Sequence, residues 1–120
     1  MTNLDDLTEA VEAAEAAGEI DIMVNNAGVW QSEDFFEVNE ADYERMMDIN
    51  LKGAYFGSQI AARRLAEGDG GSIITISSIA GLFGNGNWPT YSATNPNRSR
   101  TNSANTTSGS TQFIPAGSRR

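Results

Sequence analysis

Two short runs of apolar, mostly β-branched residues lie on either side of a long amphipathic segment. Residues 20–24 read Ile-Asp-Ile-Met-Val, and residues 72–77 read Ser-Ile-Ile-Thr-Ile-Ser. Short apolar runs bounded by turn-forming residues are typical of strands buried in a parallel sheet. Between them, apolar and small residues recur at helical spacing from residue 43 to about residue 67. Strand, long helix, strand predicts a right-handed βαβ unit with two parallel strands.

A second amphipathic segment precedes the first strand. Leu4, Leu7, Val11 and Ala14 recur at spacings of three and four with polar residues between them, which predicts a helix. Asn3 can cap its start, and a glycine at position 18 can end it. The helix is therefore expected to begin almost at residue 1.

The composition excludes several classes of function. The chain has a net charge of −8, and all 16 of its acidic residues lie within the first 69 positions. An acidic surface repels a phosphate backbone, so no nucleic-acid partner is expected. The absence of cysteine and histidine excludes disulfides, the usual zinc sites and Ser-His catalysis. No signal peptide or membrane-spanning run is visible, so no membrane partner and a cytoplasmic location are expected.

Polar side chains follow both predicted strands. Asn25, Asn26, Ala27 and Gly28 come after the first strand, and two serines, Ser77 and Ser78, end the second. Because ligands of parallel sheets bind at the carboxyl ends of the strands, both loops are expected at one ligand-binding edge.

Three features together resemble the short-chain dehydrogenase/reductase family. They are the Asn-Asn-Ala-Gly turn, Asn50 within the long helix, and Ser78 followed thirteen residues later by Tyr91. The resemblance extends over roughly residues 3–94. It implies an α/β fold that is part of a Rossmann-like, doubly wound parallel sheet. It also implies an oxidoreductase that uses NAD or NADP and a small-molecule carbonyl or secondary alcohol as substrate.

The resemblance assigns a role to each of these residues. Tyr91 would transfer the proton, Ser78 would hydrogen-bond the substrate oxygen, and Asn50 would hold a water in a proton relay. Asn26, Ala27 and Gly28 would line the adenosine side of the cofactor. A phenol has an ordinary pKa of about 10, so a tyrosine base needs a nearby positive charge. No metal ligand is implied.

The sequence departs from the family pattern at Asn95. The family has a lysine four residues after the tyrosine, and that lysine supplies the positive charge and binds the nicotinamide ribose. The chain also starts after the family's glycine-rich cofactor loop. Catalytic inactivity of this chain is therefore expected. The alternative is a non-catalytic family remnant that acts, at most, as an interaction or dimerisation module, forming a homo-oligomer through the helix from about Tyr43 to Leu65.

After Tyr91 the composition changes to serine, threonine, asparagine and arginine, without acids. Such a segment predicts a disordered tail, so the domain is expected to span residues 1–94 and the tail residues 95–120. The abrupt change suggests a shift of reading frame. Trp30, Phe83 and Trp88 remain open to two interpretations, as walls of a substrate pocket or as packing beneath loops. The substrate and the choice between NAD and NADP cannot be deduced.

Overall fold

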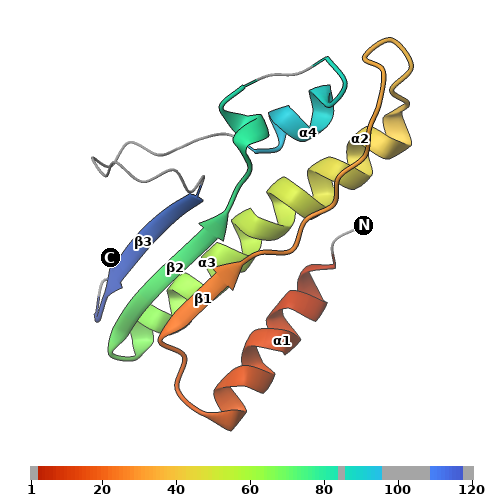
Figure 1. Ribbon diagram of the computed structural model, residues 1–120. Coiled ribbons are helices and arrows are strands. Elements are labelled where there is room, and N and C mark those ends of the chain that lie inside the picture. Colours follow the sequence, from red (N-terminus) through yellow and green to blue (C-terminus); the bar gives the residue numbers. More distant parts are fainter. Residues whose placement is uncertain (1–2, 84–85, 96–108, 118–120) are drawn as a thin grey trace.

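A three-stranded sheet forms the centre of the molecule (Figure 1). The computed structural model describes residues 3–83, 86–95 and 109–117. Strands β1 (Ile22–Asn25) and β2 (Gly70–Ile76) are parallel, with Ile22 opposite Ser72. Strand β3 (Gly109–Pro115) pairs with the other edge of β2 in the antiparallel sense. The predicted βαβ unit is therefore confirmed.

The N-terminal helix α1 (Leu4–Ala17) has the predicted bounds. The Asn3 side chain accepts a hydrogen bond from the backbone N–H of Asp5 at 3.0 Å, which satisfies one of the free donors of the first turn. The Gly18 N–H donates to the Ala14 carbonyl at 3.2 Å. Both caps predicted from the sequence are confirmed.

The long helix between the strands has three parts. Helix α2 (Glu40–Met46) is capped by Asn39, continues into a π-helical segment η1 (Met47–Gly53), and continues as α3 (Ala54–Glu67). The helix was predicted, but the π-helical segment was not. Such wider turns are rare and occur frequently at functional sites. Asn50 lies within this one.

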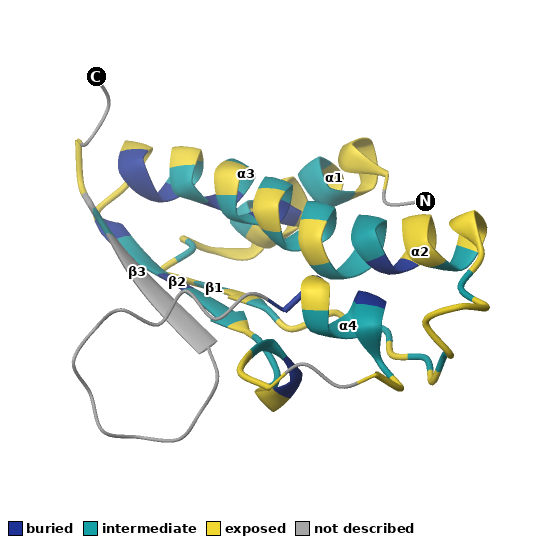
Figure 2. Cartoon of the chain, turned by 90° about the horizontal axis from the view of Figure 1, so that it is seen from above, coloured by how far each residue is buried: buried dark blue, intermediate teal, exposed yellow. Residues whose placement is uncertain are grey.

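Helices α1 and α3 cover one face of the sheet (Figure 2). The centre of the core is formed by Ala61, Leu65 and Ile73, with Met23 and Ile114 packed against it. At Gly57 a side-chain carbon would come within 2.9 Å of the Asn25 amide oxygen, so only glycine fits without a shift.

The small-residue face of α3 therefore packs on the sheet. Gly57 and Ala61 are buried there. The chain's own strands therefore occupy that face, so a partner helix would have to approach another face of α3. The exposed large side chains of this long helix are Tyr43, Leu51 and Tyr55.

The opposite face of the sheet is uncovered within the described residues. Ile22 is 59% exposed, and Val24 and Ile76 are also exposed. A doubly wound sheet has helices on both faces. The described residues supply one of these two layers.

Strand β3 lies in a segment for which no regular structure was expected. Residues 109–115 pair with β2 along its whole length, and Ile114 contacts the core. Thr, Phe and Ile favour strands, but no alternating pattern in the sequence indicated one. The rest of the predicted tail, residues 96–108 and 118–120, lies outside the described residues.

Candidate functional site

The carboxyl ends of β1 and β2 bring the two predicted loops to one edge of the sheet. Asn26, Ala27 and Gly28 follow β1 directly, and Ser77 and Ser78 follow β2. Asn26, Ala27 and Gly28 are exposed. Their backbone is thus open to solvent at the edge where ligands of parallel sheets bind.

Asn50 fastens the loop after β1 to the long helix. Its Oδ1 accepts from the Val29 N–H at 2.8 Å, and its Nδ2 donates to the Val29 carbonyl at 2.9 Å. Nδ2 also donates to the Thr94 hydroxyl at 3.1 Å. Asn50 therefore connects the Asn-Asn-Ala-Gly loop with the segment that carries Tyr91.

Asn25 has a structural role that the sequence did not indicate. Its Nδ2 donates to the Ser58 hydroxyl at 2.8 Å and to the Thr75 hydroxyl at 3.4 Å. These partners belong to α3 and β2. Asn25 thus joins three elements immediately before the exposed loop.

Ser78 caps a short 3₁₀ helix, η2 (Ile79–Gly81). Its Oγ accepts from the Ala80 N–H at 3.2 Å. An oxygen that accepts from the backbone still has its own O–H to donate. The hydroxyl can therefore donate to a bound oxygen.

Tyr91 lies in the middle of α4 (Pro89–Ala93) and is half-buried. Helix α4 packs against η2, so the segments carrying Ser78 and Tyr91 are neighbours. At Gly81 a side-chain carbon would collide with the Asn95 carbonyl oxygen. The absence of a side chain at Gly81 is what lets the two segments approach so closely.

Asn95 is 9% exposed and its side chain turns back on α4. Its Nδ2 donates to the Tyr91 carbonyl at 2.7 Å and to the Thr94 hydroxyl at 3.3 Å. The chain's single lysine, Lys52, pairs with Asp48 at 3.3 Å. The position four residues after Tyr91 therefore holds a neutral, hydrogen-bonded amide.

Thr94 is a site residue that the sequence analysis missed. It is 3% exposed, and its hydroxyl donates to the Tyr91 carbonyl at 3.0 Å while accepting from Asn50. A threonine near the end of a short helix has no distinctive pattern. Only the fold shows that it faces a residue 44 positions earlier.

Among the aromatic residues of the two loops, Trp30 and Trp88 contact each other, whereas Phe83 is exposed. The rings of Trp30 and Trp88 contact edge to face, with centroids 6.2 Å apart. Phe83 is 74% exposed. Packing beneath loops is therefore excluded for Phe83, while the tryptophans join the two loops beside Tyr91.

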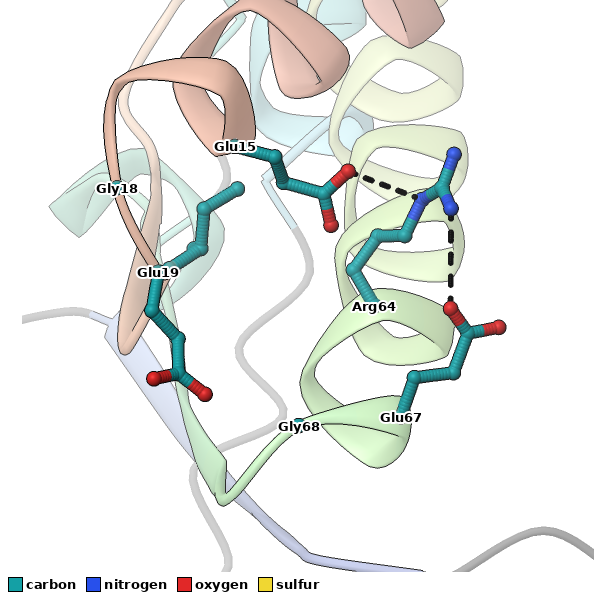
Figure 3. Close-up of a pocket in the computed structure, with 7 residues that line it drawn as sticks. Glu15, Gly18, Glu19, Arg64, Glu67 and Gly68 are labelled. Carbon is teal, nitrogen blue, oxygen red and sulfur yellow. Dashed lines mark ion pairs between the residues drawn. The ribbon is translucent and has the colours of Figure 1, made fainter.

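A cleft of about 280 Å³ lies at the other end of the sheet (Figure 3). Within it the Arg64 guanidinium pairs with Glu15 at 3.5 Å and Glu67 at 3.7 Å, and it also reaches Glu12 at 3.4 Å. The lining residues Gly18–Ile20 and Gly68 precede the strands in sequence, so the cleft lies at their amino ends. The Arg64 guanidinium is thus engaged by three carboxylates, two of which belong to α1. These ion pairs link α1 to α3 and have a structural role.

Comparison with known proteins decides the family. The family model for short chain dehydrogenases matches residues 1–95. The chain belongs to the short chain dehydrogenase family. The match covers the sheet edge, the long helix and α4, and thus every site residue described above.

Individual short chain dehydrogenases are similar over the same part of the chain. The 2-dehydro-3-deoxy-D-gluconate 5-dehydrogenase of Dickeya dadantii is 38% identical over 95 residues, which are 78% of this chain and 38% of that enzyme. The L-rhamnose 1-dehydrogenase (NAD(P)(+)) of Azotobacter vinelandii is 47% identical over 73 residues, which are 60% of this chain and 28% of that enzyme.

A solved structure confirms the fold. The short-chain dehydrogenase/reductase from Serratia marcescens superposes with a TM-score of 0.70 at 34% identity, over 78% of this chain and 43% of the other. The chain thus spans less than half the length of each of these short chain dehydrogenases.

No group of three acidic side chains in the part of the chain that the structure describes is placed to hold a metal ion. None of the described helices is long and apolar enough to cross a membrane.

Proposed function

We propose that the chain carries the catalytic edge of an oxidoreductase that transfers hydride between NAD or NADP and a carbonyl or secondary alcohol. The observation that supports this most is the hydrogen-bonded junction around Asn50. It ties Val29, which follows the exposed Asn26–Gly28 turn, to Thr94, three residues beyond Tyr91. The nucleotide-side and proton-transfer residues of the family are thereby held at one edge.

The proposed chemistry uses two hydroxyls. Ser78 donates a hydrogen bond to the substrate oxygen and stabilises the charge that develops on it. Tyr91 transfers the proton to or from that oxygen. Asn50 holds the loop and would position a water of the proton relay.

The residues expected to line the cofactor fit a flat ring. Asn26, Ala27 and Gly28 are exposed, and the last two have small or no side chains, so a ring can lie against their backbone. The cofactor, when bound, supplies or accepts the hydride.

We propose that the chain does not catalyse this reaction while position 95 is asparagine. A tyrosine acts as a base near neutral pH only beside a positive charge. The side chain of Asn95 is neutral and committed to the Tyr91 carbonyl. Lys52 is engaged by Asp48 and does not substitute for it.

A chimera tests both parts of the proposal. Residues 3–95 of this chain replace the matching segment of the Dickeya dadantii dehydrogenase, with and without N95K. The substrate and cofactor of that enzyme are then used to measure kcat/KM. We expect the N95K chimera to exceed the unaltered chimera by about 10²–10⁴, the usual contribution of acid–base catalysis.

Two controls make the chimera decisive. Adding Y91F to the N95K chimera should abolish the gain, and circular dichroism should show that all three chimeras fold. Equal activity with Asn95 and with N95K would contradict the role given to position 95. A folded N95K chimera without activity would contradict the assignment of the catalytic edge.

A non-catalytic interaction module is the second candidate. It is favoured by the exposed side chains of Tyr43, Leu51 and Tyr55, which lie along the long helix. Sedimentation of the purified chain distinguishes the two: an interaction module should dimerise, and a Y55E substitution should abolish the dimer. A strictly monomeric chain at high concentration excludes pairing through this helix.

A further inference from the structure

We propose that Glu33 is a positioning residue that latches the loop after β1 to the segment carrying Tyr91. The latch consists of Glu33, Asn87 and Thr90, together with the contact between Trp30 and Trp88. The inference rests on the proposed function only in naming Tyr91 as the reactive group.

The first contact of the latch is made by the Glu33 carboxylate. Its Oε1 accepts from the backbone N–H of Thr90 at 3.2 Å. Thr90 is buried, and it lies in the first turn of α4, where backbone N–H groups have no partner within the helix. A buried N–H without a partner is costly, so Glu33 supplies what the helix itself cannot.

The local sequence of α4 offers no alternative partner. The residue before the helix, Trp88, makes no capping hydrogen bond through its side chain, and Pro89 at the first position has no N–H. The cap is therefore supplied from a residue 57 positions earlier in the chain. Thr90 is the immediate neighbour of Tyr91, so the hydrogen bond fixes the backbone next to the phenol.

Two further contacts join the same loops. The Glu33 N–H donates to the Asn87 carbonyl at 3.0 Å. The rings of Trp30 and Trp88 meet edge to face, 6.2 Å between centroids. Three interactions thus connect residues 30–33 with residues 87–90.

The second carboxylate oxygen indicates which part of Glu33 matters. Oε2 is buried and has no hydrogen-bond partner within the described residues. Within the described residues Glu33 thus contributes one acceptor, Oε1, to the latch. Glutamine at position 33 should preserve it, whereas alanine, or aspartate with its shorter reach, should not.

The test uses probes that report on the latch without cofactor or turnover. Trp30 and Trp88 are the chain's two tryptophans, so the exciton signal of paired indoles in circular dichroism reports their contact. The chain has three tyrosines, and fluorotyrosine labelling gives a ¹⁹F resonance for each, with Y91F assigning that of Tyr91. Variants E33A, E33D and E33Q are compared with E37A, which removes an exposed carboxylate from the same loop.

We expect E33A and E33D to lose most of the exciton signal and to shift the Tyr91 resonance, leaving those of Tyr43 and Tyr55 in place. E33Q and E37A should resemble the unaltered chain. If E33A does not fold, E33D with its retained charge provides the same comparison.

Two results would overturn the latch. One is an unchanged exciton signal and Tyr91 resonance in a folded E33A or E33D. The other is an equal disturbance of all three tyrosines without rescue by E33Q, which would reduce Glu33 to general packing. Neither result bears on the chimera activities, so failure of the latch is separable from failure of the proposed function.

Discussion

Gly81, which has no side chain, sets the spacing of the two segments that carry Ser78 and Tyr91. Gly81 ends η2, and the Asn95 carbonyl at the end of α4 occupies the space that a β-carbon would need. Neighbouring contacts depend on this approach, since the Ser77 hydroxyl donates to the same carbonyl at 3.5 Å. Gly81 has no positive φ, so its backbone conformation does not demand a glycine. The close approach of the Asn95 carbonyl is what excludes a side chain at this position.

Substituting Gly81 should therefore separate η2 from α4. We expect G81A to lower the free energy of unfolding by about 1–3 kcal/mol, the usual cost of overpacking. Urea denaturation measures the effect. The control is G86A in the same loop, where no atom lies within 4 Å of the new carbon and the expected change is within about 0.5 kcal/mol. Equal stability of the two variants would contradict the close contact.

At this scale the sequence predicts which residues gather at the edge but not how they are fastened. Asn50, Ser78 and Tyr91 were named from the resemblance of their motifs, in order and spacing, to the short chain dehydrogenase family. The hydrogen bonds of Glu33, Asn25 and Thr94 were not predicted, because their partners lie 57, 50 and 44 residues away. A single polar residue has no pattern of its own, and its role appears only when the sheet and helices bring its partner near.

At the scale of elements, Arg64 ties α1 to α3. Its guanidinium reaches Glu12, Glu15 and Glu67, and the first two belong to α1. Isolated surface ion pairs contribute little, but several charges on one guanidinium hold two helices in one geometry. In an acidic chain this arginine also offsets repulsion among the three carboxylates.

Replacing Arg64 should loosen α1 in a salt-dependent way. We expect R64Q to lower the free energy of unfolding by about 1 kcal/mol at low ionic strength, with most of the loss disappearing at about 1 M salt, where screening acts within about 3 Å. R63Q is the matched control, because Arg63 is exposed and the change in net charge is the same. Denaturation of both variants at two salt concentrations provides the measurement. A loss in R64Q that is independent of salt, or equal to that in R63Q, would contradict the tie.

At the scale of the whole molecule, β3 completes the sheet. It covers the edge of β2 that would otherwise present unpaired backbone groups, and Ile114 adds to the core. The Gly117 N–H also donates to the Ala66 carbonyl at the end of α3, at 3.0 Å. Residues beyond the family match thus stabilise the part that belongs to the family.

A chain that ends at Asn95 should consequently be less stable and prone to association. We expect its melting temperature to fall by about 5 °C, since losing the partly buried side chain of Ile114 costs about 1 kcal/mol and each kcal/mol shifts a domain of this size by several degrees. Circular dichroism and light scattering on heating report both effects. A chain lacking residues 118–120 is the control. An unchanged melting temperature after removal of residues 96–120 would show that β3 contributes nothing.

The sequence could not indicate β3 because its pairing is defined by the partner strand. The pattern of residues 109–115 is not alternating, and its strand conformation depends on the free edge of β2. The βαβ unit, in contrast, is evident from sequence because its apolar runs and helical row are each continuous over many residues.

The side-chain amide of Asn50 makes the same pair of hydrogen bonds to the Val29 backbone that a peptide group would make. One side-chain donor and one side-chain acceptor pair with the backbone acceptor and donor of the same residue, as a neighbouring strand would. An ionised carboxylate has no donor, and a hydroxyl has only one oxygen for both roles. Only a side-chain amide therefore preserves both hydrogen bonds to Val29. Neither partner ionises. The candidate site, for which we propose proton transfer, is therefore held by hydrogen bonds whose geometry does not change with pH.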